Sequence, residues 1–71
     1  MSENQSVTIT LNGSERKVGG GTVDALLAEL GLNPKLVVVE HNREILDRVR
    51  LADTEVREGD VVELVHFVGG G

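Results

Sequence analysis

The first regular pattern in the chain is an alternation of apolar and polar residues over positions 7–11 (VTITL). A period of two predicts a half-buried β-strand, because successive side chains of a strand point to opposite faces. The dipeptide at 12–13 is Asn-Gly, which is typical of a tight hairpin turn since both positions accept a positive φ. Residues 14–18 should therefore return as a strand antiparallel to the first.

A helical pattern follows the hairpin. Apolar residues recur at the i, i+3, i+4 and i+7 spacing that places them on one face of a helix, and they are Val23, Leu26, Leu27 and Leu30. Thr22 is suited to cap the first turn, and Gly31 is suited to end the last turn in a left-handed conformation. Pro34 prevents the helix from continuing. We therefore expect one amphipathic helix that packs against a sheet.

The second half of the chain predicts further strands. Residues 36–39 are a continuous apolar run, which predicts a strand covered on much of both faces. A turn at 42–43 and a short returning strand over 44–46 should follow. After a turn at 58–60, the run VVELVHFV over 61–68 predicts the last strand.

The region 47–55 has no regular period, and we expect Val49, Leu51 and Val56 to act as inward anchors. The order of hairpin, helix, strand, short strand and final strand predicts an α+β fold, a mixed sheet of four to five strands with one main helix packed across it. The helix lies in the crossover between the first and last strands, so these two strands can pair in parallel. This is the β-grasp, or ubiquitin-like, arrangement.

Length and composition narrow the class of protein. The 71 residues predict one small domain over 7–68, with a disordered segment at 1–6 and a flexible glycine tail at 69–71. The absence of cysteine excludes disulfides and thiol catalysis. A net charge of −5 and a single aromatic residue disfavour nucleic acids and anionic membranes as partners. We expect a cytoplasmic protein that is monomeric alone.

No catalytic constellation is visible, and we expect no enzyme activity, cofactor or metal of the chain's own. His41 and His66 could share a metal, but no metal-ligand spacing accompanies them, so we interpret both as ordinary strand residues. The glycines at 19–21 precede a helix, as in phosphate-binding loops. The P-loop spacing and its lysine are absent, and a simple strand-to-helix connection is the preferred interpretation.

The C-terminal residues are different. Val68 is followed by Gly69, Gly70 and Gly71, whose carboxylate is ionised at neutral pH. This stretch is either a frayed terminus or a tail without side chains that can thread a channel too narrow for a Cβ. Four residues beyond Phe67 span ~13 Å when extended, which is enough to enter another protein's active site. An ionised carboxylate is a poor electrophile, so using it as an acyl donor requires activation by a partner enzyme.

In order and spacing, several stretches of this chain together resemble the ThiS family of ubiquitin-like sulfur carriers in thiamine biosynthesis, over residues 7–71. The stretches are Thr22-Val23 with Leu26-Leu27 and Leu30, Val37-Val38-Val39-Glu40 with Asn42, Glu44-Ile45, Gly59-Asp60 with Val62-Glu63-Leu64-Val65, and Val68-Gly69-Gly70-Gly71. Family members commonly have Ile-Val-Pro-Arg and then an aromatic residue where this chain has Ile45-Leu46-Asp47-Arg48 and then Leu51.

The resemblance implies a cycle of sulfur transfer. A ThiF-type enzyme would adenylate Gly71, and sulfur from a desulfurase acting on cysteine would convert the carboxylate to a thiocarboxylate. Thiazole synthase would then receive the sulfur. Other possibilities are a MoaD-type or tRNA-thiolation carrier, a protein modifier joined to lysines through Gly71, and an interaction module with an inert tail.

The last strand also predicts a docking surface. Its side chains alternate between faces, so Glu63, Val65 and Phe67 share one face. Because an unpaired Glu63 is costly to bury, this face should point outward. We expect Val65, Phe67 and Val68 to contact a partner beside the reactive terminus. The alternative is that Phe67 folds back into the core.

Overall fold

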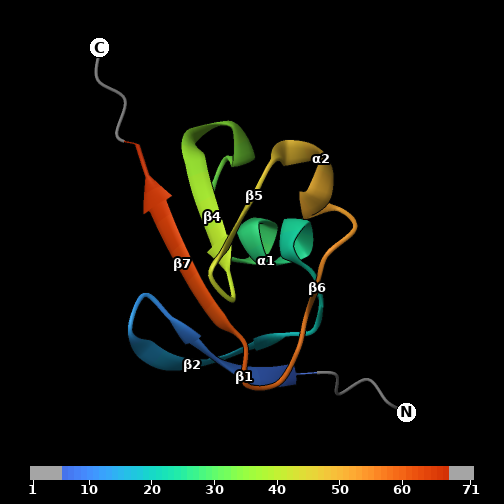
Figure 1. The fold of residues 1–71 in the computed structure, drawn as a ribbon. Coiled ribbons are helices and arrows are strands. Elements are labelled where there is room, and N and C mark those ends of the chain that lie inside the picture. Colours follow the sequence, from blue (N-terminus) through green and yellow to red (C-terminus); the bar gives the residue numbers. More distant parts are fainter. Residues whose placement is uncertain (1–5, 68–71) are drawn as a thin grey trace.

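The computed structural model describes residues 6–67 of the chain. A sheet curves around one main helix (Figure 1). In chain order the elements are β1 (Ser6–Leu11), β2 (Ser14–Gly19), β3 (Gly21–Thr22), α1 (Val23–Glu29), the 3-10 helix η1 (Pro34–Leu36), β4 (Val37–His41), β5 (Glu44–Leu46), α2 (Arg48–Leu51), β6 (Glu55–Val56) and β7 (Val61–His66). β1 begins at Ser6, within the segment predicted to be disordered; the rest of that segment lies outside the described residues.

The main sheet has five strands in the order β2-β1-β7-β4-β5. β1 and β7 are parallel, with Thr10 opposite Val61, whereas the other neighbouring strands are antiparallel. This mixed sheet with one main helix confirms the predicted β-grasp fold. Within residues 6–67, no helix is long and apolar enough to cross a membrane.

Both ends of α1 form as their residues predict. The Thr22 hydroxyl accepts a hydrogen bond from the Ala25 amide at 3.2 Å, which satisfies one of the free N–H groups of the first turn. At the other end Gly31 has φ +73° and the Leu32 amide donates to the Leu27 carbonyl at 2.9 Å. This pattern closes the helix in the left-handed manner that favours glycine.

The core lies between α1 and one face of the sheet. Its buried side chains come from every large element, and none of the side chains buried in the described chain is polar or charged. The core residues are Ile9, Val18, Val23, Leu26, Leu27, Val39, Leu46, Leu51, Val56 and Val62. Leu30, the last predicted member of the helix stripe, is half-buried against them.

The strand predicted over residues 36–39 is present from Val37 onwards, but the expectation that it is covered on much of both faces is wrong. Leu36 belongs to η1, where Asn33 caps the turn and Pro34 occupies its first position. Within β4, Val39 is buried but Val38 is 37% exposed. The physical reason is that α1 covers only one face of the sheet, so alternate residues of β4 remain in contact with solvent on the other.

The region 47–55 is more ordered than its pattern indicates. The Asp47 carboxylate accepts a hydrogen bond from the Arg50 amide and caps α2. Leu51 is buried as predicted, but Val49 is 78% exposed, so its expected role as an inward anchor is wrong. In so short a helix only one side faces the core, and Leu51 occupies it. The pairing of β3 with β6 is also absent from the sequence-based expectations.

Candidate functional site

The strand that leads to the C-terminal tail is the middle strand of the sheet. β7 lies between β1 and β4 (Figure 1), and in the sequence residues 67–71 follow it. The predicted tail, Gly69 to Gly71, and the predicted docking residue Val68 lie outside the described residues. The structure therefore describes the strand that precedes the tail, but not the tail.

Two asparagines at turns hold β7 in place. The Asn12 side chain accepts a hydrogen bond from the Leu64 amide at 2.7 Å and donates one to the Leu64 carbonyl at 3.2 Å. The Asn42 side chain accepts from the Val61 amide at 2.9 Å. Both asparagines have positive φ, which their short polar side chains tolerate. Both residues are turn signals in the sequence, but no local pattern predicts their contacts with β7.

An exposed apolar surface surrounds the point where β7 ends. Val65 lies directly opposite Val38, and the Phe67 amide donates to the Leu36 carbonyl at 2.8 Å. Val65 is 56% exposed and Phe67 52%. We call Leu36, Val38, Val65 and Phe67 the outer patch, because the alternation along β4 and β7 places Val38 and Val65 on the face opposite α1. Phe67 therefore does not fold back into the core.

The outer patch contains two residues that the sequence analysis did not propose. Leu36 and Val38 stood in a run interpreted as covered, and only the antiparallel register of β4 with β7 identifies their neighbours. Further along the same face Glu40 lies directly opposite Glu63. Like charges at such a position repel, so this part of the face favours a cationic partner.

Neither a pocket nor a group of side chains that could hold a metal ion is found in the part of the chain that the structure describes. The Gly19 amide donates to the carboxylate of Glu29, the last residue of α1, at 3.0 Å. This N–H group of the glycine stretch is therefore bonded within the protein, which favours the interpretation of residues 19–21 as a simple strand-to-helix connection.

His41 takes part in a polar cluster at the opposite end of β7 from the tail. Its Nε2 lies 2.8 Å from the Asp60 carboxylate, which also accepts hydrogen bonds from the Arg57 amide and the Asn42 side chain. Burial alone would raise the pKa of Asp60, but these hydrogen bonds and the nearby His41 outweigh it and lower that pKa. These contacts connect the turn after β4 with the turn before β7.

The lowered pKa of Asp60 predicts a pH dependence of stability. A carboxylate with a depressed pKa in the folded state stabilises the fold above its unfolded pKa and loses this contribution as the pH falls through the folded value. We expect Asp60→Asn to lower the free energy of unfolding at pH 7. Urea unfolding from pH 7 down to the acid transition should show a smaller pH dependence below about pH 5 for the variant. An identical pH dependence in both proteins would contradict the role of Asp60.

Comparison with known proteins places the chain among small sulfur carriers. The model of the ThiS family matches residues 9–71. The sulfur carrier protein ThiS of Bacillus subtilis is 45% identical over 65 residues, which cover 89% of this chain and 98% of that protein. A thiazole synthase of Paramagnetospirillum magneticum is 44% identical over 64 residues, but these make up only 20% of its length.

A solved structure agrees with the sequence comparisons. The crystal structure of the thiamine biosynthesis protein ThiS from Geobacter metallireducens matches with a TM-score of 0.78 at 36% identity. The match covers 92% of this chain and all of that one. The family match over nearly the whole chain, the high identity to a full-length relative and the shared β-grasp fold lead to one conclusion: the chain belongs to the ThiS family.

Proposed function

We propose that this protein is a sulfur carrier of thiamine biosynthesis whose reactive group is the Gly71 carboxylate. The observation that carries the proposal is the glycine tail at the end of a chain that belongs to the ThiS family. The described residues support it because they offer a folded platform and an exposed apolar surface but no pocket. In this role the protein is the substrate of its partner enzymes rather than a catalyst.

The chemistry begins with activation on a ThiF-type enzyme. A Gly71 carboxylate oxygen attacks the α-phosphorus of ATP, pyrophosphate leaves, and an acyl adenylate forms. The outer sulfur of a persulfide that a desulfurase has formed from cysteine then attacks the carbonyl carbon and displaces AMP. A thiol, such as a second cysteine, cleaves the S–S bond of the resulting acyl disulfide, so that the thiol side is oxidised to a disulfide and the acyl side keeps one sulfur. The product is a terminal thiocarboxylate, whose sulfur is a softer nucleophile than carboxylate oxygen. The side-chain-free Gly69 and Gly70 would let the terminus pass through a narrow channel.

The proposed acceptor of the sulfur is thiazole synthase. Two thiazole synthases contain a segment similar to this chain, at 44% and 39% identity over 64 residues each. The presence of a segment similar to this chain within the same polypeptide as a thiazole synthase supports a functional association between the two. The relatives in the comparison favour the thiamine pathway over carriers for molybdopterin synthesis or tRNA thiolation. The cytoplasmic location stays a prediction.

In this proposal the folded domain binds the activating enzyme through the outer patch, together with Val68. The Phe67 ring is half-exposed next to the tail, and its burial by a partner would contribute up to ~3 kcal/mol. We expect Phe67→Ala to weaken binding to the activating enzyme at least tenfold, because about 1.4 kcal/mol corresponds to a factor of ten in affinity. Isothermal titration calorimetry measures the change.

A matched control separates docking from general loss of apolar surface. Val49 is 78% exposed and belongs to α2 rather than the outer patch, so Val49→Ala should leave the affinity unchanged. Thermal unfolding of both variants should resemble that of the parent. Strong destabilisation of Phe67→Ala with unchanged affinity would show that the ring stabilises the fold and that docking occurs elsewhere.

The proposed activation is tested by ATP–pyrophosphate exchange. A ThiF-type enzyme should exchange labelled pyrophosphate into ATP only when this protein is present, because the adenylate forms reversibly on Gly71. Absence of exchange with an enzyme that activates another ThiS protein would contradict the proposal. Exchange followed by covalent adducts to lysines of other proteins would instead support a protein modifier.

A further inference from the structure

The backbone of β7 has two sides, and they differ in how their hydrogen-bonding groups are satisfied. The antiparallel ladder with β4 uses alternate residues: the Phe67 amide donates to the Leu36 carbonyl, and the Val61 carbonyl accepts from the Asn42 amide. Odd-numbered residues of β7 therefore direct their N–H and C=O groups towards β4. The even-numbered residues direct theirs away from β4, towards the side of β1.

β1 satisfies only the first part of that second side. The Asn12 amide donates to the Val62 carbonyl at 2.9 Å, and the Asn12 side chain then bonds both the amide and the carbonyl of Leu64. Beyond Leu64 the hairpin turns away at Asn12 and Gly13 (Figure 1). His66 is the next even-numbered residue, and within residues 6–67 its amide and carbonyl have no hydrogen-bond partner.

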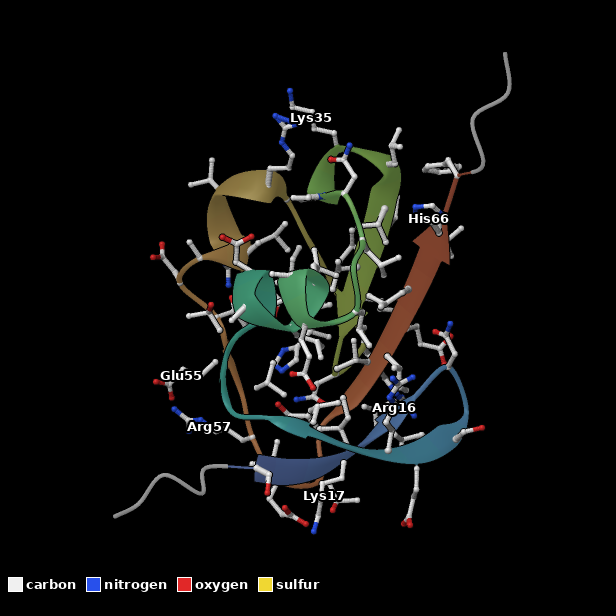
Figure 2. The ribbon with its side chains drawn as sticks, turned by 180° about the vertical axis from the view of Figure 1, so that it is seen from behind. Arg16, Lys17, Lys35, Glu55, Arg57 and His66 are labelled. Atoms are coloured by element: carbon white, nitrogen blue, oxygen red, sulfur yellow. The ribbon has the colours of Figure 1, made fainter. Side chains whose placement is uncertain are left out.

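We propose that an extended segment of the activating enzyme adds to β7 as a further strand and hydrogen-bonds the amide and carbonyl of His66. This inference rests on the proposed function and specifies how the partner holds the strand. Exposed backbone groups of this kind are a template for strand addition, in which main-chain hydrogen bonds provide affinity. His66 is solvent-exposed near the end of β7 (Figure 2), and within residues 6–67 no strand pairs with β7 on this side beyond Leu64.

The position of His66 explains why the activating enzyme is the occupant. The last four residues of the chain, 68–71, span at most ~13 Å, so an enzyme that reacts with the terminal carboxylate must lie close to the end of β7. Val65 and Phe67 flank His66 in the sequence and are the exposed members of the outer patch on this strand. Side chains of the same added strand could therefore contact them. A second copy is a poorer occupant, because two chains of net charge −5 repel each other.

Amide hydrogen exchange tests the proposal on the unmodified protein. In the free protein the His66 amide should exchange rapidly, whereas the Leu64 amide, bonded to Asn12, should exchange more slowly. In the complex with the ThiF-type enzyme we expect exchange at His66 to slow at least tenfold. Unchanged exchange at His66 in a complex that still adenylates the carrier would overturn strand addition but not the proposed function. Slow exchange in the free protein that depends on its concentration would overturn the enzyme as occupant and indicate a dimer.

A pair of variants separates the backbone of His66 from its side chain. His66→Pro removes the amide hydrogen on the side away from β4, a position where proline is tolerated in strands. We expect it to weaken binding to the enzyme about fivefold, as for the loss of one hydrogen bond. His66→Thr retains the amide and should change affinity less than twofold. Equal affinities for both variants, with unchanged thermal unfolding, would contradict the proposal, and failure of all forms to bind would overturn the proposed function as well.

Discussion

Deletion of Gly71 is expected to abolish thiocarboxylate formation while the thermal unfolding of the protein stays unchanged. The truncation moves the terminal carboxylate back by one residue, about 3.5 Å along an extended chain. A displacement of 1 Å at a reacting centre can cost a factor of about 100 in rate, so the loss should exceed a hundredfold. Single-turnover adenylation measures this loss, and a differential scanning calorimetry scan measures the stability.

The truncated chain provides its own control for docking. Its outer patch lies within residues 36–67 and is unchanged, so its affinity for the activating enzyme should fall much less than its rate of adenylation. Gly71→Ala is the matched variant for the loss of length, because it retains the length of the chain and adds only a Cβ. If the truncated protein still acquired sulfur at the parent's rate, the Gly71 carboxylate would not be the reactive group.

Leu27→Ala is expected to have the largest effect on the fold. Leu27 has no exposed surface and lies on the face of α1 that packs against the sheet. Truncating a buried leucine typically costs about 2–5 kcal/mol, and small proteins are stable by only about 5–15 kcal/mol. We expect the melting temperature to fall by about 10 °C or more, since each kcal/mol shifts it by about 4–8 °C in a domain of this size.

Circular dichroism during heating measures the effect of Leu27→Ala. Val49→Ala is the matched control, because Val49 is exposed on α2 and its truncation leaves no cavity. It should change the melting temperature by only a few degrees. A Leu27→Ala protein as stable as the parent would show that α1 does not contribute to the core through this residue.

The parts of the fold that the sequence predicts well depend on local chemistry. The turn at Asn12 and Gly13 requires two positive φ angles, and α1 begins and ends at Thr22 and Gly31 because these residues satisfy its free backbone groups. The parallel pairing of β1 with β7 followed from the crossover that contains the helix. The alternation along β7 correctly predicted that Val65 and Phe67 are exposed.

The remaining features depend on contacts between distant segments. An apolar run such as 36–39 does not reveal whether one face or both are covered, and here the sheet has a helix on only one side. Val49 and Leu51 are equally apolar, yet only the packing of α2 decides which is buried. The bonds from Asn12 to Leu64 join residues 52 positions apart, and no local pattern predicts them.

For the candidate site, the sequence shows the tail itself but only half of the surface beside it. Gly69 to Gly71 are recognisable because three glycines follow a strand, and Val65 and Phe67 because of their alternation. Leu36 and Val38 join them only through the pairing of β4 with β7. The backbone of His66 has no strand partner on the side of β1 within residues 6–67, and this becomes visible only when the end of β1 is known.

The most direct test of the account is the intact mass of the protein after incubation with ATP, a ThiF-type enzyme, a cysteine desulfurase and cysteine. Replacement of one carboxylate oxygen by sulfur should increase the mass by the difference between these two atoms. Fragmentation should assign the increase to Gly71. An unchanged mass, or an increase located at any other residue, would contradict the account.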